Sequence, residues 1–306
     1  MQAYTSSQLE NTPFGHLHIV EKVLRMIKLL EEINRSDFLM KSLALKGGTA
    51  LNLIYWDLPR LSIDLDFNYV GQIEKDKMLN DRNKITDLIF NIASFLGYSF
   101  NHQKDKYAQD RFILSYDKFN GGNETIEIEI NYMLRVPLFA PKKNKPKIIL
   151  NKFHIPSVVS LSFEEIAASK FTALLFRATP RDLFDAVEIV KSKSMLKYRL
   201  LKSAFIFYCS IQSDNFEKIT QKLYRRISNH EIKTNLLQTL RRGVHFKLKT
   251  AFEILDPFID RLLRFNKKEN LYLTLFSNKE FKPELLFKDN IKKIKNHPRV
   301  PWLFEK

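Results

Sequence analysis

The sequence predicts an α+β protein in which a mixed half, containing strands and helices, precedes a mainly helical half. Alternating apolar and polar residues, the pattern of half-buried strands, lie in the first half, whereas apolar residues spaced by three and four dominate the second. A stretch rich in lysine and proline, APKKNKPKIILNKFHIP, lies between the two patterns. The 306 residues suit about two domains or one large one. We therefore expect one domain over 1–155 and a second over 156–306.

The first half contains two segments with helical periodicity and three with strand alternation. The helices are expected at 17–33 and 80–97, and the strands at 60–70, 111–116 and 124–133. An apolar stretch broken by two glycines, LALKGGTALNLIYW, separates the first helix from the first strand. The glycine pair therefore marks a turn between a strand and a helix.

The second half opens with two helix-start signals. Ser162 followed by Glu165 predicts a capping box, with Ser162 as the N-cap of a helix that runs to about Arg177. Thr179 and Pro180 then predict the N-cap and first residue of another helix. Further helices are expected over 197–212, 214–228, 230–241 and 249–264.

The composition excludes several classes of protein. Hydrophobic residues make up 44% and charged residues 27%, which excludes a chain that is disordered throughout. The single cysteine, Cys209, excludes a disulfide framework and any zinc site built from several cysteines. Its apolar surroundings favour a buried structural thiol, and a lone thiol fits a reducing compartment.

Positive charge is concentrated in the second half of the chain. The net charge is +16 and the pI about 9.7. Residues 1–155 carry 21 Lys and Arg against 18 Asp and Glu, a net +3, whereas 156–306 carry 29 against 16, a net +13. Such a one-sided field favours a polyanion partner, nucleic acid first and an anionic membrane surface second. A general lysine-rich surface is the alternative interpretation.

No targeting or membrane-spanning segment is expected. The N-terminal MQAYTSSQLENTPFGH is polar and lacks the basic-then-apolar pattern of a secretory signal. No apolar run approaches the ~18 residues of a spanning helix. These features predict a cytoplasmic protein.

The segment RLSIDLDF carries two carboxylates on one strand face. Strand alternation places the polar side chains opposite the apolar ones, on a face that comprises Arg60, Ser62, Asp64 and Asp66. Carboxylates at i and i+2 repel each other unless they are solvated or bridged by a cation. A pair on a strand with an apolar back is a common way to hold Mg²⁺ against a phosphate, and a solvated strand face is the alternative.

The glycine turn just upstream of this carboxylate pair is a candidate phosphate-binding site. In Lys46-Gly47-Gly48-Thr49, the glycines allow close approach of a ligand to the backbone, and a helix that begins there aims free N–H groups at an anion. Thr49 could add a hydroxyl. The turn is not a Walker loop, because no G-x-x-x-x-G-K-[ST] occurs. A phosphate cradle and a metal pair could therefore meet at one sheet end, the alternative being a plain strand-to-helix turn.

A third acidic candidate lies on the strand ETIEIEINYM. Its apolar residues face one side, and Glu127, Glu129 and Asn131 face the other. A neighbouring strand could place Glu129 beside Asp64 and Asp66. Three carboxylates fit the two-metal scheme of phosphoryl or nucleotidyl transfer, whereas an exposed strand face needs no metal.

The two helices of the second half carry a further set of charges. Lys170 and Arg177 are spaced i, i+7, Asp182 and Asp185 are spaced i, i+3, and Arg181 lies between the helices. A lysine that neutralises a triphosphate, with acids that orient it, would have this pattern. Ordinary interhelical ion pairs are the alternative.

In this order, KGGTAL, RLSIDLDF, IEIEINY and SFEEIAASKFTALLFRATPRDLFDAVEI resemble the AbiEii/AbiGii family of nucleotidyltransferase-type toxins. The resemblance covers roughly residues 43–190. It implies a polymerase-β-like nucleotidyltransferase core with a mixed sheet, followed by a mainly helical part. It also implies a toxin of a toxin–antitoxin or abortive-infection system, with a cognate antitoxin. Some members of the family add nucleotides to tRNA acceptor ends.

The resemblance also implies roles for particular residues. The family's Gly-Gly-[Ser/Thr] motif falls on Gly47, Gly48 and Thr49; its metal carboxylates on Asp64 and Asp66; its strand acid on Glu129; and its K…RD..D motif on Lys170, Arg181, Asp182 and Asp185. Arg60 and Ser62 share the carboxylate face and are candidate nucleotide contacts.

We therefore expect an enzyme that uses Mg²⁺ or Mn²⁺ to transfer a nucleotide from an NTP to an RNA acceptor, tRNA being the first candidate. Glu129 completes the metal site or accepts the acceptor's hydroxyl proton, and Lys170 offsets phosphate charge. Residues 156–306 bind the RNA, and Tyr224 and Phe246 are candidates for stacking on unpaired bases. The rival hypotheses are a metal-dependent nuclease and a catalytically inert nucleic-acid-binding module.

Overall fold

The computed structural model describes residues 4–10, 12–104, 108–146, 157–212 and 221–305. The chain forms two compact units, and it crosses between them several times. Unit 1 comprises Met1–Pro137, Pro141–Leu161 and Thr239–Val244. Unit 2 comprises Leu138–Ala140, Ser162–Gln238 and His245–Lys306. The boundary expected between residues 155 and 156 lies outside the described residues.

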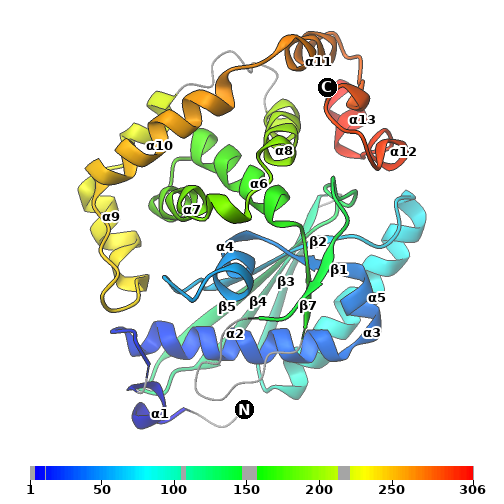
Figure 1. Cartoon of the computed structure of the whole chain (residues 1–306). Helices are drawn as coiled ribbons and strands as arrows, with labels where there is room; N and C mark the ends of the chain where they lie inside the picture. Colours follow the sequence, from blue (N-terminus) through cyan, green and yellow to red (C-terminus); the bar gives the residue numbers. More distant parts are fainter. Residues whose placement is uncertain (1–3, 11, 105–107, 147–156, 213–220, 306) are drawn as a thin grey trace. The chain divides into compact units, whose positions relative to one another are not determined.

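Unit 1 is built on a mixed sheet of seven strands in the order β3-β4-β5-β2-β1-β7-β6 (Figure 1). The strands are β1 (Leu43–Leu45), β2 (Asp64–Tyr69), β3 (Ser99–Lys104), β4 (Gln109–Asp117), β5 (Asn123–Asn131), β6 (Lys142–Asn144) and β7 (Val158–Ser160). Strand β2 pairs parallel with β5 and antiparallel with β1. Two strands that are far apart in the sequence, β2 and β5, are therefore neighbours at the centre of the sheet.

The helices of unit 1 follow from the amphipathic segments of the sequence. They are α1 (Ser6–Glu10), α2 (Leu17–Arg35), α3 (Asp37–Ser42), α4 (Gly47–Ala50), the π-helical turn η1 (Leu51–Tyr55) and α5 (Lys75–Phe95). Helices α2 and α5 pack against the sheet (Figure 1). A buried ion pair, with Arg82 Nη2 of α5 2.7 Å from Asp110 Oδ1 of β4, joins the helix to the sheet.

The alternation of β2 and β5 separates an apolar sheet face from a polar one. Leu65, Phe67, Ile128 and Ile130 are buried with at most 2% of their surface exposed, and they share one face of the sheet; helix α2 packs against these two strands. The carboxylates between them in the sequence lie on the opposite face. The apolar alternation therefore fixes the direction in which the polar side chains point.

Unit 2 is helical, as the sequence predicts. Its helices are α6 (Phe163–Phe176), α7 (Pro180–Lys191), η2 (Lys193–Met195), α8 (Tyr198–Gln212), η4 (Gln221–Arg226), α9 (Asn229–Asn235), α10 (Leu248–Leu263), α11 (Lys267–Ser277), η6 (Pro283–Leu285), α12 (Ile291–Ile294) and α13 (Arg299–Phe304). A short turn, η5 (Leu237–Thr239), precedes the return of the chain to unit 1.

Both helix-start signals are confirmed, but one of them only in part. Ser162 Oγ accepts a hydrogen bond from the amide of Glu165, and Thr179 Oγ1 accepts one from that of Asp182. The reciprocal half of the expected capping box is absent among the described contacts. The Glu165 carboxylate instead accepts hydrogen bonds from the amides of Leu138 and Phe139 and from the Tyr208 hydroxyl. Donors from distant parts of the chain thus replace the local Ser162 amide as partners of this carboxylate.

Four sequence-based boundaries are wrong. The helix expected over 80–97, α5, begins at Lys75. In the strand expected at 60–70, regular pairing begins only at Asp64. The helix expected over 230–241 ends at Asn235, because the chain beyond it is bonded to another segment: the Leu61 amide donates to Thr239 O at 2.8 Å. Of the helix expected over 214–228, 214–220 lie outside the described residues and 221–226 form a 3₁₀ turn.

The α+β class with a mixed sheet and many helices is thus confirmed. The helices in the described ranges include none that is long and apolar enough to cross a membrane.

Candidate functional site

The glycine turn, Gly47–Thr49, follows β1 and forms the first turn of the short helix α4 in unit 1. Gly47 has a φ of +70°, a conformation that favours glycine. Its Cα also lies so close to Asp66 that an added Cβ would collide with Oδ2 of that carboxylate. The amides of Gly47, Gly48 and Thr49 lie in the first turn of the helix, where no intrahelical acceptor exists. The turn therefore presents backbone donors directly beside a carboxylate.

The Thr49 hydroxyl, expected to contact a phosphate, instead bonds the backbone. This hydroxyl is fully buried and donates to the carbonyl oxygen of Asp64 at 2.5 Å. This bond ties the turn to the start of β2. Thr49 can therefore serve an anion through its backbone amide, and its hydroxyl proton is already committed.

Arg60 and Ser62 lie against the second glycine of the turn. A Cβ added at Gly48 would collide with the Arg60 guanidinium and come within 3.0 Å of Ser62 Oγ. Arg60 is buried to 1% exposure although it is charged, and its Nη1 donates to Leu61 O at 3.0 Å. Both residues thus lie beside the turn, as their shared polar pattern predicts, although residues 60–63 are not part of β2.

A segment from the second half of the chain holds Arg60 in place. Arg60 forms an isolated β-bridge with Leu240. The Arg241 amide donates to Pro59 O at 3.0 Å, and its side chain bonds Asp57 Oδ2 at 2.6 Å. These contacts explain why Arg241, which comes from the basic second half of the sequence, belongs to unit 1.

The candidate carboxylates lie on one face of adjacent strands. Asp64 and Asp66 of β2 are each half-buried, and Asp66 is directly paired with Glu129 of the parallel strand β5. The same register pairs Asp64 with Glu127. The sequence-based expectation that a neighbouring strand brings Glu129 beside the D-x-D pair is confirmed.

The surroundings of Glu129 hold its pKa above the ordinary value. Burial contributes most to this shift, Asp66 adds to it by repulsion, and the charges of Lys46 and Arg111 oppose it. Arg111 of β4 pairs directly with Glu129 in the sheet, and its Nε lies 3.2 Å from Glu127 Oε2. The face is therefore acidic, with compensating basic groups at its edges.

The donor set fits a hard divalent cation that takes its remaining ligands from a phosphate. Among the residues that the structure describes, no group of three or more His, Cys, Asp or Glu side chains is arranged to hold a metal by itself. Mg²⁺ is usually held by one or two carboxylates plus substrate oxygens rather than by an all-protein cage. The Asp64–Asp66 pair fits this pattern, and Glu129 as a third ligand remains a prediction.

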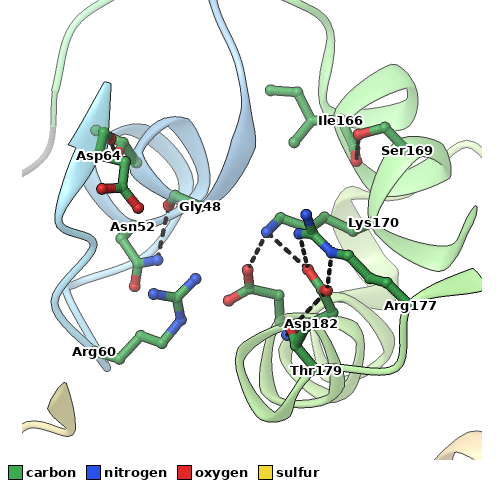
Figure 2. Close-up of polar contacts among 12 residues, drawn as sticks. Gly48, Asn52, Arg60, Asp64, Ile166, Ser169, Lys170, Arg177, Thr179 and Asp182 are labelled. Atoms are coloured by element: carbon green, nitrogen blue, oxygen red, sulfur yellow. Dashed lines mark hydrogen bonds and ion pairs between the residues drawn. The ribbon is translucent and has the colours of Figure 1, made fainter. Parts of the chain in front are cut away.

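Unit 2 contains the second candidate set, on α6 and α7 (Figure 2). Lys170 Nζ lies 2.8 Å from Asp185 Oδ2 and 3.4 Å from Asp182 Oδ1. Arg177 also bonds Asp182, with Nε 2.6 Å from Oδ2. Lys170, Asp182 and Asp185 are buried, whereas the Arg177 side chain is 62% exposed. The interhelical ion pairs that the sequence offered as an alternative are thus present.

The Asp182 carboxylate is held in its ionised form. Burial alone would raise its pKa, but hydrogen bonds from Arg177 and Thr179 and the charge of Lys170 together hold that pKa well below its usual range. Arg181 is half-buried on the same helix, α7. This set therefore combines a buried ammonium group with two compensating carboxylates.

Of the two residues expected to stack on RNA bases, Tyr224 is buried and Phe246 is half-buried. Tyr224 is fully buried, and its hydroxyl donates to Asp256. Phe246 packs against Phe184, with ring centroids 5.6 Å apart. Arg225, next to Tyr224, also forms an ion pair with Asp256. Tyr224 is therefore a core residue, and one face of the half-buried Phe246 is taken by Phe184.

Two residues beside the candidate set were missed from the sequence. Arg111 could have been found, because the alternation of RFILSY places it on the face opposite Phe112 and Leu114. Asn52 could not, because it lies within an apolar run. Its Nδ2 donates to Gly48 O at 2.8 Å (Figure 2).

Two solved structures match this chain over most of its length. MenT4, a nucleotidyltransferase toxin from Mycobacterium tuberculosis H37Rv, matches with a TM-score of 0.64 over 98% of this chain and 99% of its own, at 14% identity. JHP933 from Helicobacter pylori matches with a TM-score of 0.48 over 85% of this chain and 93% of its own, at 18% identity. The likeness to MenT4 shows a shared fold.

Comparison with curated proteins finds no match to the sequence. A family model described as nucleotidyl transferase AbiEii toxin of a type IV toxin–antitoxin system matches residues 28–265. This range includes the glycine turn, the strand carboxylates and the charged set of α6 and α7. The chain therefore belongs to the AbiEii family of nucleotidyl transferase toxins.

Proposed function

We propose that this toxin is a Mg²⁺-dependent cytoplasmic enzyme that transfers a nucleoside monophosphate from an NTP to an RNA acceptor, with tRNA as the first candidate. The observation that carries the proposal is the contact between the glycine turn and Asp66. A Cβ added at Gly47 would collide with Asp66 Oδ2, which shows that backbone donors for phosphate and a carboxylate for a cation lie side by side.

Different residues of unit 1 bind the phosphates of the nucleotide and the metal ion. The amides of Gly48 and Thr49 bind the β- and γ-phosphates, and Arg60 and Ser62 stand beside Gly48 to add charge and a hydroxyl. Asp64 and Asp66 hold the metal, for which Mn²⁺ is a substitute. When bound, the cation neutralises phosphate charge and orients the α-phosphate for in-line attack.

The reaction needs a base for the acceptor. An acceptor hydroxyl oxygen forms a bond to the α-phosphorus, the bond from that phosphorus to the bridging oxygen of the β-phosphate breaks, and pyrophosphate leaves. Glu129 is the candidate base for the hydroxyl proton, and its raised pKa favours that role. Metal ligation is its alternative role.

Unit 2 is proposed to supply Lys170 and the acceptor surface. Lys170 offsets negative charge that develops on the phosphates, while Asp182 and Asp185 fix its ammonium group, and Arg181 adds positive charge. The net +13 of residues 156–306 supports an RNA acceptor, because phosphate contacts dominate such binding. Membership of a toxin–antitoxin family also implies a cognate antitoxin.

One labelling experiment tests the reaction class and the acceptor together. The purified protein is incubated with total RNA and each α-labelled NTP, with and without Mg²⁺, and the labelled RNA is sequenced. Metal-dependent label at RNA ends supports the proposal. Shortened, unlabelled RNA would instead indicate the rival nuclease, and label in protein alone would overturn the RNA acceptor. Loss of label in Asp66→Asn assigns the activity to this site.

A further inference from the structure

Asn52 lies one turn beyond the glycine pair, at a point where the helix changes its winding. Helix α4 passes into the π-helical turn η1, in which the Trp56 amide donates to Leu51 O at 3.0 Å. Single π-helical turns often occur at functional sites. Asn52 lies in this turn, and its side chain reaches back along the helix to Gly48.

The Gly48 carbonyl accepts two hydrogen bonds. One comes from the Leu51 amide and the other from Asn52 Nδ2 at 2.8 Å. A planar trans peptide unit points its C=O and N–H in opposite directions. A carbonyl that points along the helix toward its C-terminal end therefore directs the amide of the next residue, Thr49, toward the helix start. Asn52 thus fixes the direction of an N–H group that it does not touch.

The surroundings of Asn52 do not explain why an amide is present. Its side chain is 0% exposed, and its neighbours Leu51, Leu53 and Ile54 are buried apolar residues. Its Oδ1 has no hydrogen-bond partner among the described residues. A buried oxygen without a partner is destabilising, and an apolar side chain of the same shape would avoid that cost. Only the donor of Asn52 has a visible use.

We infer that Asn52 is a positioning residue of the nucleotide site, which orients the Gly48–Thr49 peptide so that the Thr49 amide donates to the NTP phosphates. The inference rests on the proposed function. Asn52 lies outside the Gly-Gly-Thr motif and does not itself contact the nucleotide; it acts only through the peptide that it orients.

The test compares two variants that differ mainly in one donor. Asn52→Ser keeps a hydroxyl that can bond the carbonyl four residues earlier, whereas Asn52→Ala has no donor. Both leave a similar void, so their melting temperatures should be close. Asn52→Ala should raise the KM for NTP by roughly tenfold or more, because the phosphate loses a well-directed donor. Asn52→Ser should recover part of that loss, and the KM for RNA should stay the same in both.

Asn34→Leu is the matched control. Asn34 makes the same kind of bond, from Nδ2 to Leu30 O at 2.6 Å, but on another helix, α2. It should leave the KM for NTP unchanged. Asn52→Leu should bind NTP as weakly as Asn52→Ala while melting at the wild-type temperature or above. Equal KM values for NTP in wild type, Asn52→Ser and Asn52→Ala would overturn the inference.

Calorimetric titration of each NTP with Mg²⁺, without RNA, distinguishes a failure of the proposed function from a failure of the Asn52 inference. If the wild type binds an NTP but labels no RNA, the proposed acceptor is wrong and the Asn52 inference is still tested by the binding constants. If NTP affinity is equal in the wild type and Asn52→Ala while labelling of RNA is normal, the inference alone fails.

Discussion

Asp66 and Glu129 are directly paired residues on the parallel strands β2 and β5, although 62 residues separate them in the sequence. Their side chains therefore share one sheet face, on which Asp64 also lies. Repulsion between such neighbours contributes to the raised pKa of Glu129, after the larger effect of burial. A cation bound between the strands would relieve this repulsion, which is the physical argument for a metal at this position.

Asp66→Asn should abolish nucleotide transfer and leave the fold intact. The amide has the same shape but loses the charge that binds a cation, and removal of one like charge from the face should leave the melting temperature equal or slightly raised. Asp87→Asn, at an exposed position of α5, is the control. Wild-type transfer by Asp66→Asn would remove Asp66 from the site.

Gly47→Ala should destroy NTP binding by a steric effect that can be separated from backbone strain. The left-handed φ costs an alanine about 1–2 kcal/mol, and the new Cβ also collides with Asp66 Oδ2. Gly121→Ala carries the same kind of strain, at φ +88°, with no atom within 4 Å of its Cβ. Both variants should therefore lose stability in denaturation, but only Gly47→Ala should lose NTP affinity in calorimetry. Equal affinities would contradict the proposed phosphate turn.

Lys170→Ala should reduce the transfer rate far more than Arg177→Ala. Both side chains pair with Asp182, so a purely structural role predicts similar effects. Lys170 is buried and also pairs with Asp185, so its removal should cost roughly 3–5 kcal/mol of stability. Transfer rates are therefore compared at a temperature where both variants are folded, with exposed Lys197→Ala as a second control. Similar rates for Lys170→Ala and Arg177→Ala would make Lys170 structural.

RNA affinity should fall steeply with salt, with a log–log slope of about 0.7 per phosphate contacted on a single strand. Charge reversal at the exposed Arg226 and Arg242 should weaken RNA binding and lower the slope. Reversal at Arg225 and Arg241 should have less effect through charge, because Asp256 and Asp57 already neutralise them. The KM for NTP should change little at Arg225, Arg226 and Arg242. Reversal at Arg241 should raise it, because it breaks the bond to Asp57 in the segment that holds Arg60. Salt-independent RNA affinity would contradict the polyanion interpretation.

The free energy of unfolding should fall as the pH rises from about 4.5 to 7, in part because of Glu165. Burial raises the pKa of Glu165 to about 7, against the hydrogen bonds from Leu138, Phe139 and Tyr208 that lower it. The folded protein therefore holds an extra proton in this window, and the contribution is of the order of 3 kcal/mol at roughly 1.4 kcal/mol per pKa unit.

Glu165→Gln should flatten this pH dependence, as measured by chemical denaturation at pH 5 and pH 7.5. Glu164→Gln, at the adjacent half-buried position, should leave it unchanged. An unchanged slope in Glu165→Gln would mean that another group titrates in this range.

The sequence alone predicted much of the site because its signals are local. The alternation of RLSIDLDF and IEIEINY assigned the carboxylates to one face. Thr179 and Pro180 fixed the start of α7 through short-range hydrogen bonding and a restricted φ. The glycine pair marked the turn. Each of these depends on residues within a few positions of one another.

Only the tertiary structure decided the features that depend on distant partners. The pairing of Asp66 with Glu129, the return of Leu240 to Arg60, and the use of the Glu165 carboxylate by Leu138 and Phe139 join segments that no local pattern connects. Asn52 was missed for a different reason: its partner, the Gly48 carbonyl, is only four residues away, but the amide lies within an apolar run and no sequence pattern marks it. Local patterns set which way a side chain points along its own element, whereas packing and hydrogen-bond satisfaction across elements set what it meets there.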